Sequence, residues 1–441
     1  MRTYSSLGIE KYITLGFLSL ILTGTFFLWL FNLLFASSIT LLDALFLSTS
    51  AVCVTGLSPF DIGTVLSVPS QLVLLTLVQL GGVGIMTATT ALMLAMGRRI
   101  HFRERLFLAG GLGVSSPQGV VRLLHQVLVY TLSFEAIGTF LLFVGFIGEG
   151  MPLHTAFYNA FFHSISAFCN AGFSLFPDNL QSYSLSILLP GTIMLLIVSG
   201  GIGFPVMVEI VDYQRGVRPF FSPYAKIVLT ATSLLVVMGA VVITLSEWHN
   251  AFSALPYWAR FWNALFGSVT SRTAGFDTVS ISTWSTEGLI ALGLFMLIGA
   301  SPSSTGGGLK TTTFTVLLWS AWKELKQEDD VNIWGRQIAS RTIRRALAMA
   351  FLYLFTLFFG SSLLSILEEQ PFFSLVFEAV SALGTVGLST GITFDLSSAG
   401  KMVIILLMYW GRVGLLTFSY SVVPQEKYAK VYLPETHIPI G

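Results

Sequence analysis

The chain has 441 residues, of which 54% are hydrophobic and only 10% are charged, and its formal net charge is +1. No soluble domain of this length needs so much apolar surface, whereas a bilayer-spanning helix needs roughly 20 consecutive apolar residues. The composition therefore predicts an all-α integral membrane protein, excludes a soluble globular domain, and gives no sign of a nucleic-acid partner.

Long apolar segments alternate along the chain with short amphipathic ones. We expect long first helices near 13–35, 119–147, 224–246 and 346–366. Short segments follow near 40–52, 154–168, 257–270 and 372–383, and their length suits helices that enter a membrane halfway and return. Second long helices are expected near 68–96, 184–212, 284–318 and 398–423. The pattern predicts eight full spans plus four re-entrant pore helices.

One phrase recurs at the end of each short segment. The four copies read AVCVTGLS, AFCNAGFS, TSRTAGFD and ALGTVGLS, aligned on Gly56, Gly172, Gly275 and Gly387. Ten residues upstream of the glycines lie Phe46, Phe162, Leu265 and Phe377. Recurrence at a long period indicates a repeated structural unit. We therefore predict four M1–P-loop–M2 repeats in a pseudo-fourfold arrangement around a central pore, at residues 1–96, 97–213, 214–318 and 319–423, with a cytoplasmic tail at 424–441.

The glycine phrases carry the chemistry expected of a cation pathway. A dehydrated cation needs oxygen ligands, and a ring of backbone carbonyls supplies them without fixed charges that would trap the ion. Glycine permits backbone angles that a Cβ would penalise and lets four segments crowd around one axis. Close helix packing is the alternative explanation for membrane glycines, and it fits GGVG (81–84) and SGGIGF (199–204) better than the phrases, which share neighbours as well.

Basic residues are distributed unequally between the two sides of the predicted membrane. The side that holds both termini carries 18 of the 23 Lys and Arg residues, which predicts cytoplasmic termini. The opposite side, where the phrases open, carries eleven acids: Asp43, Asp61, Glu149, Asp178, Glu247, Asp277, Glu287, Glu368, Glu369, Glu378 and Asp395. These would concentrate cations at an entrance, although ordinary solvation of outer loops explains part of the excess.

The second helix of the third repeat is interrupted by ASPSSTGGGLKTTT at residues 300–313. Proline, three successive glycines and a run of hydroxyls cannot continue a helix in lipid, so this stretch is expected to line a cavity. It is not a nucleotide-binding loop, because Leu309 separates the glycines from the lysine. Lys310 and Arg412 are costly at membrane depth, roughly 2.5–3.5 kcal/mol each. Snorkelling to the interface is an open alternative for Lys310.

These phrases resemble the filter of the Trk/Ktr/HKT superfamily of potassium transporters, and TVG at 385–387 is similar to the potassium-channel filter. The resemblance covers essentially the whole chain. It is strongest with KtrB-type membrane subunits, because only one span precedes the first phrase. It implies a K⁺-binding filter of backbone carbonyls from Val54, Thr55, Gly56, Leu57, Asn170, Ala171, Gly172, Phe173, Thr273, Ala274, Gly275, Phe276, Thr385, Val386, Gly387 and Leu388. Glycine at position 56 favours potassium, since serine there accompanies sodium selectivity in the plant branch.

The resemblance also implies a gate and partners. The gate would be the intramembrane loop 300–313, with Ser303, Thr305, Gly306, Gly307, Gly308, Lys310 and Arg412, where the arginine faces the pore and holds loop carbonyls. The family forms homodimers on a cytoplasmic KtrA-like ring of RCK subunits that binds the nucleotide. Transport would be stimulated by Na⁺ and located in the plasma membrane. No bound cofactor is expected on this chain.

Several residues have a structural explanation at this stage. Cys53 and Cys169 are expected to be small side chains flanking the filter, and His154 and His163 to be interfacial. Arg272 is expected to brace the third phrase through an acid such as Asp277. Glu135 is expected to bond a neighbouring helix or to be protonated.

Three other functions stay open from the sequence. A TrkH-type transporter subunit shares the same repeats. An inverted-repeat secondary transporter would show twofold symmetry and more polar helix centres. A membrane-embedded enzyme would need a metal or nucleophile arrangement, which the six histidines do not suggest.

Overall fold

The structure, a computed structural model, describes residues 9–35, 39–96, 102–111, 118–328 and 330–422. The predicted tail at 424–441 and several of the basic residues counted above, among them Arg98 and Arg99, lie outside this part. The described chain is helical except for one small hairpin, β1 (Asn332–Ile333) paired antiparallel with β2 (Arg336–Gln337).

The long first helices and the short helices lie where the sequence predicts them. The long helices are α1 (Ile9–Phe35), α7 (Val120–Gly148), α11 (Pro223–Glu247) and α15 (Ser340–Leu367). The short helices are α2 (Leu41–Val52), α8 (Leu153–Phe168), α12 (Tyr257–Thr270) and α16 (Phe372–Gly384). Each short helix ends within the first three residues of its glycine phrase, so the rest of the phrase lies just beyond the helical backbone.

The second helices differ from the prediction, because all four are broken rather than one. Their parts are α4 (Val68–Val83) and α5 (Ile85–Ala95), α9 (Leu188–Gly201) and α10 (Phe204–Gln214), α13 (Thr286–Leu297) and α14 (Thr311–Leu325), and α17 (Ser398–Val413) and α18 (Leu415–Val422). Three breaks contain one glycine each, Gly84, Gly203 and Gly414, with φ of 90°, 93° and 87°. These angles lie outside the helical region and strongly favour glycine. The continuous second helices predicted for repeats one, two and four are therefore wrong.

Within the described residues, four helices are long and apolar enough to cross a membrane, namely α1, α7, α11 and α15. The number rises to six if each of two bent pairs counts as one span. The bent pairs are α9 with α10, at 101°, and α17 with α18, at 92°. Shorter elements complete the chain: α3 (Ile62–Val65), α6 (Phe102–Gly111), and the 3₁₀ turns at Gln181–Tyr183, Ile281–Thr283 and Ile392–Asp395.

The short helices form the interior and the long helices the exterior. In α16, every residue from Phe377 to Gly384 is buried, whereas α15 exposes large apolar side chains such as Phe351 and Phe358. An apolar exterior suits a lipid environment. Phe46, Phe162 and Phe377 are all fully buried, but the matching residue of α12 is Phe266. Leu265 was the wrong match, because the third repeat has one residue fewer between its aromatic anchor and its glycine.

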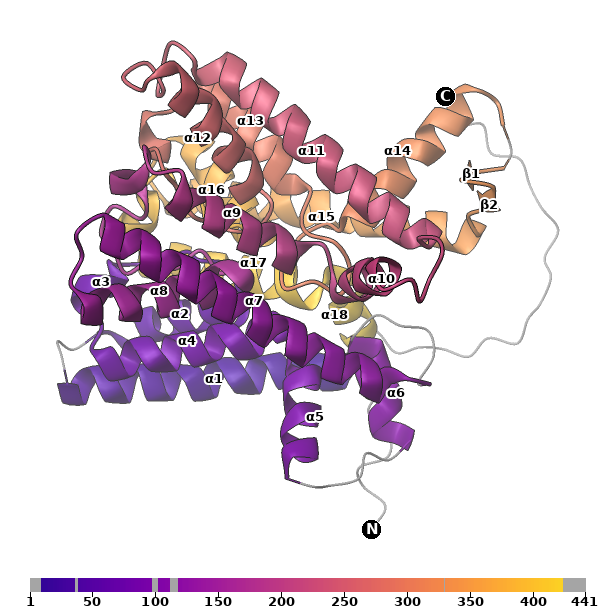
Figure 1. The fold of residues 1–441 in the computed structure, drawn as a ribbon. Helices are drawn as coiled ribbons and strands as arrows, with labels where there is room; N and C mark the ends of the chain where they lie inside the picture. Colours follow the sequence, from indigo (N-terminus) through magenta and orange to yellow (C-terminus); the bar gives the residue numbers. More distant parts are fainter. Residues whose placement is uncertain (1–8, 36–38, 97–101, 112–117, 329, 423–441) are drawn as a thin grey trace.

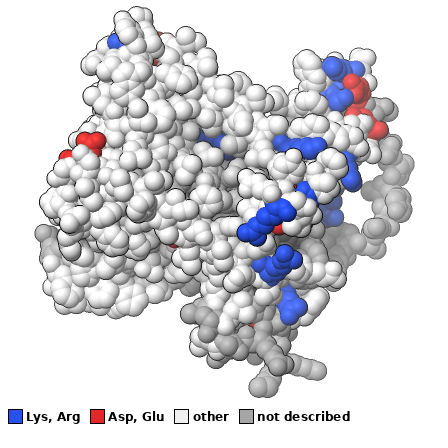
Figure 2. All heavy atoms as spheres, in the orientation of Figure 1, with Lys and Arg blue, Asp and Glu red and all other residues white. Residues whose placement is uncertain are grey.

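The two ends of the molecule differ. Figure 1 shows the short helices α2, α8, α12 and α16 toward the left, and α6, α10 and α14 toward the right. Figure 2 shows Lys and Arg gathered at the right-hand end. The exposed basic residues of the described chain there include Arg215, Arg218, Lys226, Lys326, Arg341 and Arg344. The breaks in the second helices thus lie between the end of the molecule that holds the glycine phrases and the end where the basic residues gather.

Candidate functional site

The four glycine phrases meet one another in a closed cycle. At each phrase glycine, an added Cβ would collide with the backbone of the next phrase, at 2.5 Å from Ala171 O for Gly56, 2.5 Å from Ala274 O for Gly172 and 2.6 Å from Val386 O for Gly275. A Cβ on Gly387 would collide with Thr55 O and so close the cycle. Segments up to 331 positions apart in the chain therefore share one axis, and no side chain fits between them.

The sign of the backbone angle φ follows the same alternating pattern in all four phrases. The residue two before each glycine has a positive φ, at 56° for Val54, 57° for Asn170, 70° for Thr273 and 51° for Thr385. The glycines themselves have φ from 70° to 98°. Positive φ is an outlier for β-branched residues and costs of order 1–3 kcal/mol each. Alternation of left- and right-handed residues turns successive carbonyls toward one side, unlike an ordinary strand.

Hydroxyl side chains of the short helices hold the phrases in this conformation. Ser50 Oγ accepts a hydrogen bond from Gly56 N at 3.1 Å, and Ser381 Oγ accepts one from Gly387 N at 3.0 Å. In the other two repeats the hydroxyl donates instead: Ser166 Oγ donates to Phe173 O at 2.9 Å, and Thr270 Oγ1 donates to Phe276 O at 2.6 Å. These bonds satisfy buried backbone groups that the strained turns would otherwise leave unpaired.

Two buried ionisable side chains stand behind the second and fourth phrases at corresponding positions. His163 Nε2 lies 3.0 Å from Ser174 Oγ, and Glu378 Oε1 accepts a hydrogen bond from Ser389 Oγ at 3.0 Å. Both residues are fully buried. The interfacial location expected for His163 is therefore wrong, and Glu378 is not a solvated outer acid. The second and fourth phrases are therefore each supported by a buried polar side chain, whereas the first repeat has Leu47 at the same position.

A cavity of about 260 Å³ lies on the outer side of the ring and is lined by Gly56, Gly275 and Gly387. Asp277 also lines it, and burial raises the pKa of its carboxyl to about 7, opposed by a hydrogen bond from Gln181. The Gln181 Nε2 to Asp277 Oδ2 distance is 2.8 Å. Arg272 makes no ion pair with Asp277 among the described residues, so the predicted bridge is wrong. The guanidinium lies instead against apolar residues of α9 and α11.

Other predicted outer acids have structural partners. Glu247 accepts hydrogen bonds from the backbone and hydroxyl of Ser285, at the start of α13. Glu368 does the same for Ser397, at the start of α17. These carboxylates therefore fix the starts of α13 and α17, a structural role that the sequence does not reveal.

The segment between α13 and α14 lies directly beneath the third and fourth phrases. A Cβ on Gly306 would collide with the hydroxyl of Thr273, and one on Gly307 with that of Thr385. The loop is anchored to the second repeat at both ends of its turn. Ser301 N donates to Gly201 O at 3.1 Å, Thr305 N donates to Gly200 O at 3.2 Å, and Ser303 O accepts from Phe204 N at 2.9 Å.

Two cations hold this loop through its backbone carbonyls. Lys310 Nζ donates to Gly306 O at 2.8 Å, so the side chain folds back on its own loop and does not snorkel. Arg412 of α17 donates to Thr305 O and to Gly81 O, and lies 3.4 Å from Gly82 O. One guanidinium therefore joins the fourth repeat to the loop and to the break after α4.

A second cavity, of about 240 Å³, lies on the other side of the loop. Its lining includes Lys310, Arg412, Gly306 and the broken segment at Gly84. The ring and the loop therefore stand between two cavities. Both contain polar groups, which permits water and ions to occupy them.

The remaining candidates have structural roles. Cys53 and Cys169 are buried free thiols beside the phrases, as expected. Ser164 of α8 donates a hydrogen bond to the backbone carbonyl of Glu135 at 2.7 Å, whereas bonding of the Glu135 carboxyl group to a neighbouring helix stays a prediction. Sequence reasoning missed Gly84, Gly203 and Gly414 as breaks, although a Gly-x-Gly pattern precedes or contains each of the first two.

Comparisons with known proteins agree with one another. A family model described as TrkH, cation transport protein, matches residues 13–431. The chain is 35% identical to Ktr system potassium uptake protein B of Bacillus subtilis, over 94% of this chain and 93% of that one. It is also 35% identical to the potassium/sodium uptake protein NtpJ of Enterococcus hirae, over 100% and 99% of the two chains. The crystal structure of the potassium transporter TrkH from Vibrio parahaemolyticus has the same fold, with a TM-score of 0.74 at 20% identity over 96% of this chain and 87% of that one.

Proposed function

The chain belongs to the TrkH family of cation transport proteins, and we propose that its ring of glycine phrases selects K⁺ by replacing the ion's water shell with backbone carbonyls. It is a multi-pass potassium-uptake membrane subunit of the Ktr/Trk type. The closed cycle of four backbone turns is the observation that carries the proposal. Carbonyl rings select cations in this way because they offer several oxygens without a fixed charge.

In this proposal the ion follows one path. It enters the outer cavity, passes the carbonyls of the phrases that contain Gly56, Gly172, Gly275 and Gly387, and meets the loop at residues 300–313. The loop closes the path because Gly306 and Gly307 lie against the inner edge of the ring. Conduction then requires the loop to move into the inner cavity. Lys310 and Arg412 oppose that movement by their bonds to loop carbonyls.

The four repeats would surround the path with eight spans and four pore helices, with the basic end in the cytoplasm. Gathering of Lys and Arg at the end away from the phrases supports this orientation (Figure 2). The same end would bind a cytoplasmic RCK ring, and two copies of the chain would form the membrane dimer. Stimulation by Na⁺ is part of this proposal, and one relative is named a potassium/sodium uptake protein.

Uptake of Rb⁺ and of Na⁺ into liposomes tests the selecting role. Substitution of Gly56→Ser places a side chain where an ideal Cβ already lies 2.5 Å from Ala171 O. We expect Rb⁺ over Na⁺ discrimination to fall by about tenfold, a change of about 1.4 kcal/mol. Gly148→Ser is the matched control, because a Cβ there meets nothing within 4 Å. Unchanged discrimination in Gly56→Ser would remove this glycine from the selecting ring.

A further inference from the structure

The repeats pack against one another in a cycle, as the phrases do. Each second helix contacts the short helix of the following repeat: α4 contacts α8, α9 contacts α12, and α13 contacts α16. The cycle closes where α17 contacts α2. This last seam joins the first repeat to the fourth, whereas the other three join repeats that follow one another along the chain.

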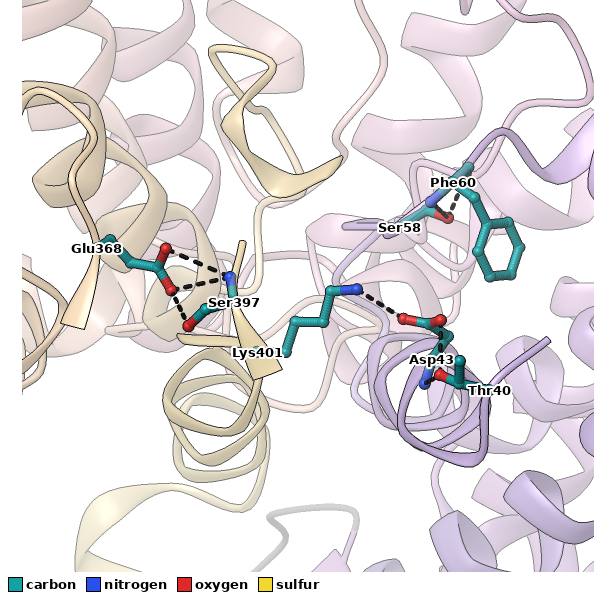
Figure 3. Close-up of polar contacts among 7 residues, drawn as sticks. All are labelled: Thr40, Asp43, Ser58, Phe60, Glu368, Ser397 and Lys401. Carbon is teal, nitrogen blue, oxygen red and sulfur yellow. Dashed lines mark hydrogen bonds and ion pairs between the residues drawn. The ribbon is translucent and has the colours of Figure 1, made fainter. Parts of the chain in front are cut away.

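The closing seam contains a shielded ion pair. Lys401 Nζ of α17 lies 2.7 Å from Asp43 Oδ1 of α2, and the two side chains are only 16% and 17% exposed. The residues are 358 positions apart in the chain. Figure 3 shows the lysine extending from α17 directly to the carboxylate. Each partner is in the first turn of its helix, and Asp43 also accepts a hydrogen bond from Thr40, which caps α2.

Neutral contacts are found at two other seams. Gln71 follows the cap of α4 by four residues, as Lys401 follows the cap of α17, and it accepts a hydrogen bond from Tyr158 of α8 at 2.7 Å. In the next seam, Asn263 of α12 donates to Ser184 O at 3.0 Å. The ion pair therefore occurs at the seam that joins distant parts of the chain.

We propose that Asp43 and Lys401 form a latch that closes the ring and sets the position of the first phrase against the fourth. Helix α2 leads from Asp43 without a break to the phrase at 54–57, so a shift at its start moves the phrase. At the same seam, Gly387 is in contact with Thr55 O. The two residues are thus positioning residues, and the effect on ion selection rests on the proposed function.

A double-mutant cycle tests the latch. Asp43→Asn and Lys401→Met each remove one charge at nearly constant size, and we expect each to lower Rb⁺ over Na⁺ discrimination in liposomes by about 3- to 10-fold. The double substitution should be no worse than either single one, because an interaction lost once cannot be lost again. The reversed pair, Asp43→Lys with Lys401→Asp, should recover most of the discrimination. Asp61→Asn is the control, since Asp61 caps α3 within its own repeat.

Several results would overturn the latch. One is additive effects of the two neutral substitutions, and another is a lower melting temperature with unchanged discrimination, which would mean a purely structural pair. If the reversed pair fails to fold, Asp43→Glu with Lys401→Arg replaces it and must keep the discrimination. Failure of the unsubstituted protein to prefer Rb⁺ would overturn the proposed function instead. Non-additivity in the melting temperature would then still decide whether the pair closes the seam.

Discussion

Backbone carbonyls line two neighbouring regions of this molecule, the glycine phrases and the loop beneath them, but they differ in their hydrogen-bond donors. The carbonyls of the glycine phrases lie between cavities and have no Lys or Arg among their hydrogen-bond donors in the described chain. Those of the loop at 305–307 are held by the ammonium of Lys310 and the guanidinium of Arg412. In the proposed function, the same group binds a passing cation in the phrases, and in the loop it holds a cation that is part of the chain.

This comparison suggests how the path is closed at rest. A tethered cation satisfies loop carbonyls that would otherwise be unpaired at membrane depth, where an unpaired group costs several kcal/mol. It also places positive charge below the ring, which opposes idle flow of cations. Selection and closure would therefore use one kind of ligand, and substitutions in the two regions should have different consequences.

The largest effect is expected from Gly275→Ala. Its φ is 79°, and an added Cβ would lie 2.6 Å from Val386 O, with backbone on both sides. Because neither backbone can withdraw, we expect Rb⁺ uptake to fall at least tenfold. Gly293→Ala, in the interior of α13 with nothing within 4 Å of its Cβ, is the control. Normal uptake in Gly275→Ala would show that the ring tolerates a side chain and is not the narrow point.

An opposite change is expected from Arg412→Gln. The substitution removes the contact between α17 and Thr305 O and frees the loop from the break after α4. We expect Rb⁺ uptake in the absence of any partner to rise by about fivefold, with ion discrimination unchanged. Arg336→Gln, on the exposed hairpin, is the matched control. A loss of Rb⁺ over Na⁺ discrimination would mean that Arg412 contributes to ion selection. The phrases and the loop would then not have separate roles.

Lys310→Met should act in the same direction but less strongly. This lysine bonds carbonyls of its own loop, at 2.8 Å for Gly306 O, and among the described residues it forms no hydrogen bond to another repeat. We expect partner-free uptake to rise by about twofold, measured as for Arg412→Gln. Lys310→Arg, which keeps a donor, should restore resting closure. If partner-free uptake rose more than in Arg412→Gln, the loop would be held mainly by its internal bonds from Lys310 and not by its contact with α17.

The sequence predicts the helical pattern closely and the geometry of the site only in part. Apolar period and length place α1, α7, α11 and α15, because lipid imposes both. The common glycines predict a shared backbone conformation, but not the positive φ of Val54 or Thr385, which only the packing of four turns imposes. The breaks at Gly203 and Gly414 were missed, since glycine in a membrane helix serves packing equally well.

The side-chain partners were the least predictable feature. Arg272 and Asp277 are close in sequence and opposite in charge, yet the carboxylate takes Gln181 from the preceding repeat. Asp43 and Lys401 are far apart in sequence and form an ion pair. Contacts between repeats depend on which helices are neighbours in the ring. A single sequence does not show this order.

The smallest effect is expected from a change of pH, which acts on the outer cavity above the phrases. Burial raises the pKa of Asp277 to about 7, so its carboxyl is largely neutral at about pH 6 and largely ionised at about pH 8. Because Asp277 lines the outer cavity, ionisation should raise the local cation concentration there. We expect uptake from dilute Rb⁺ to rise about twofold across this range, with no change at saturating Rb⁺. Asp277→Asn should abolish the rise, and a slope that persists in this variant would assign the titration to another group.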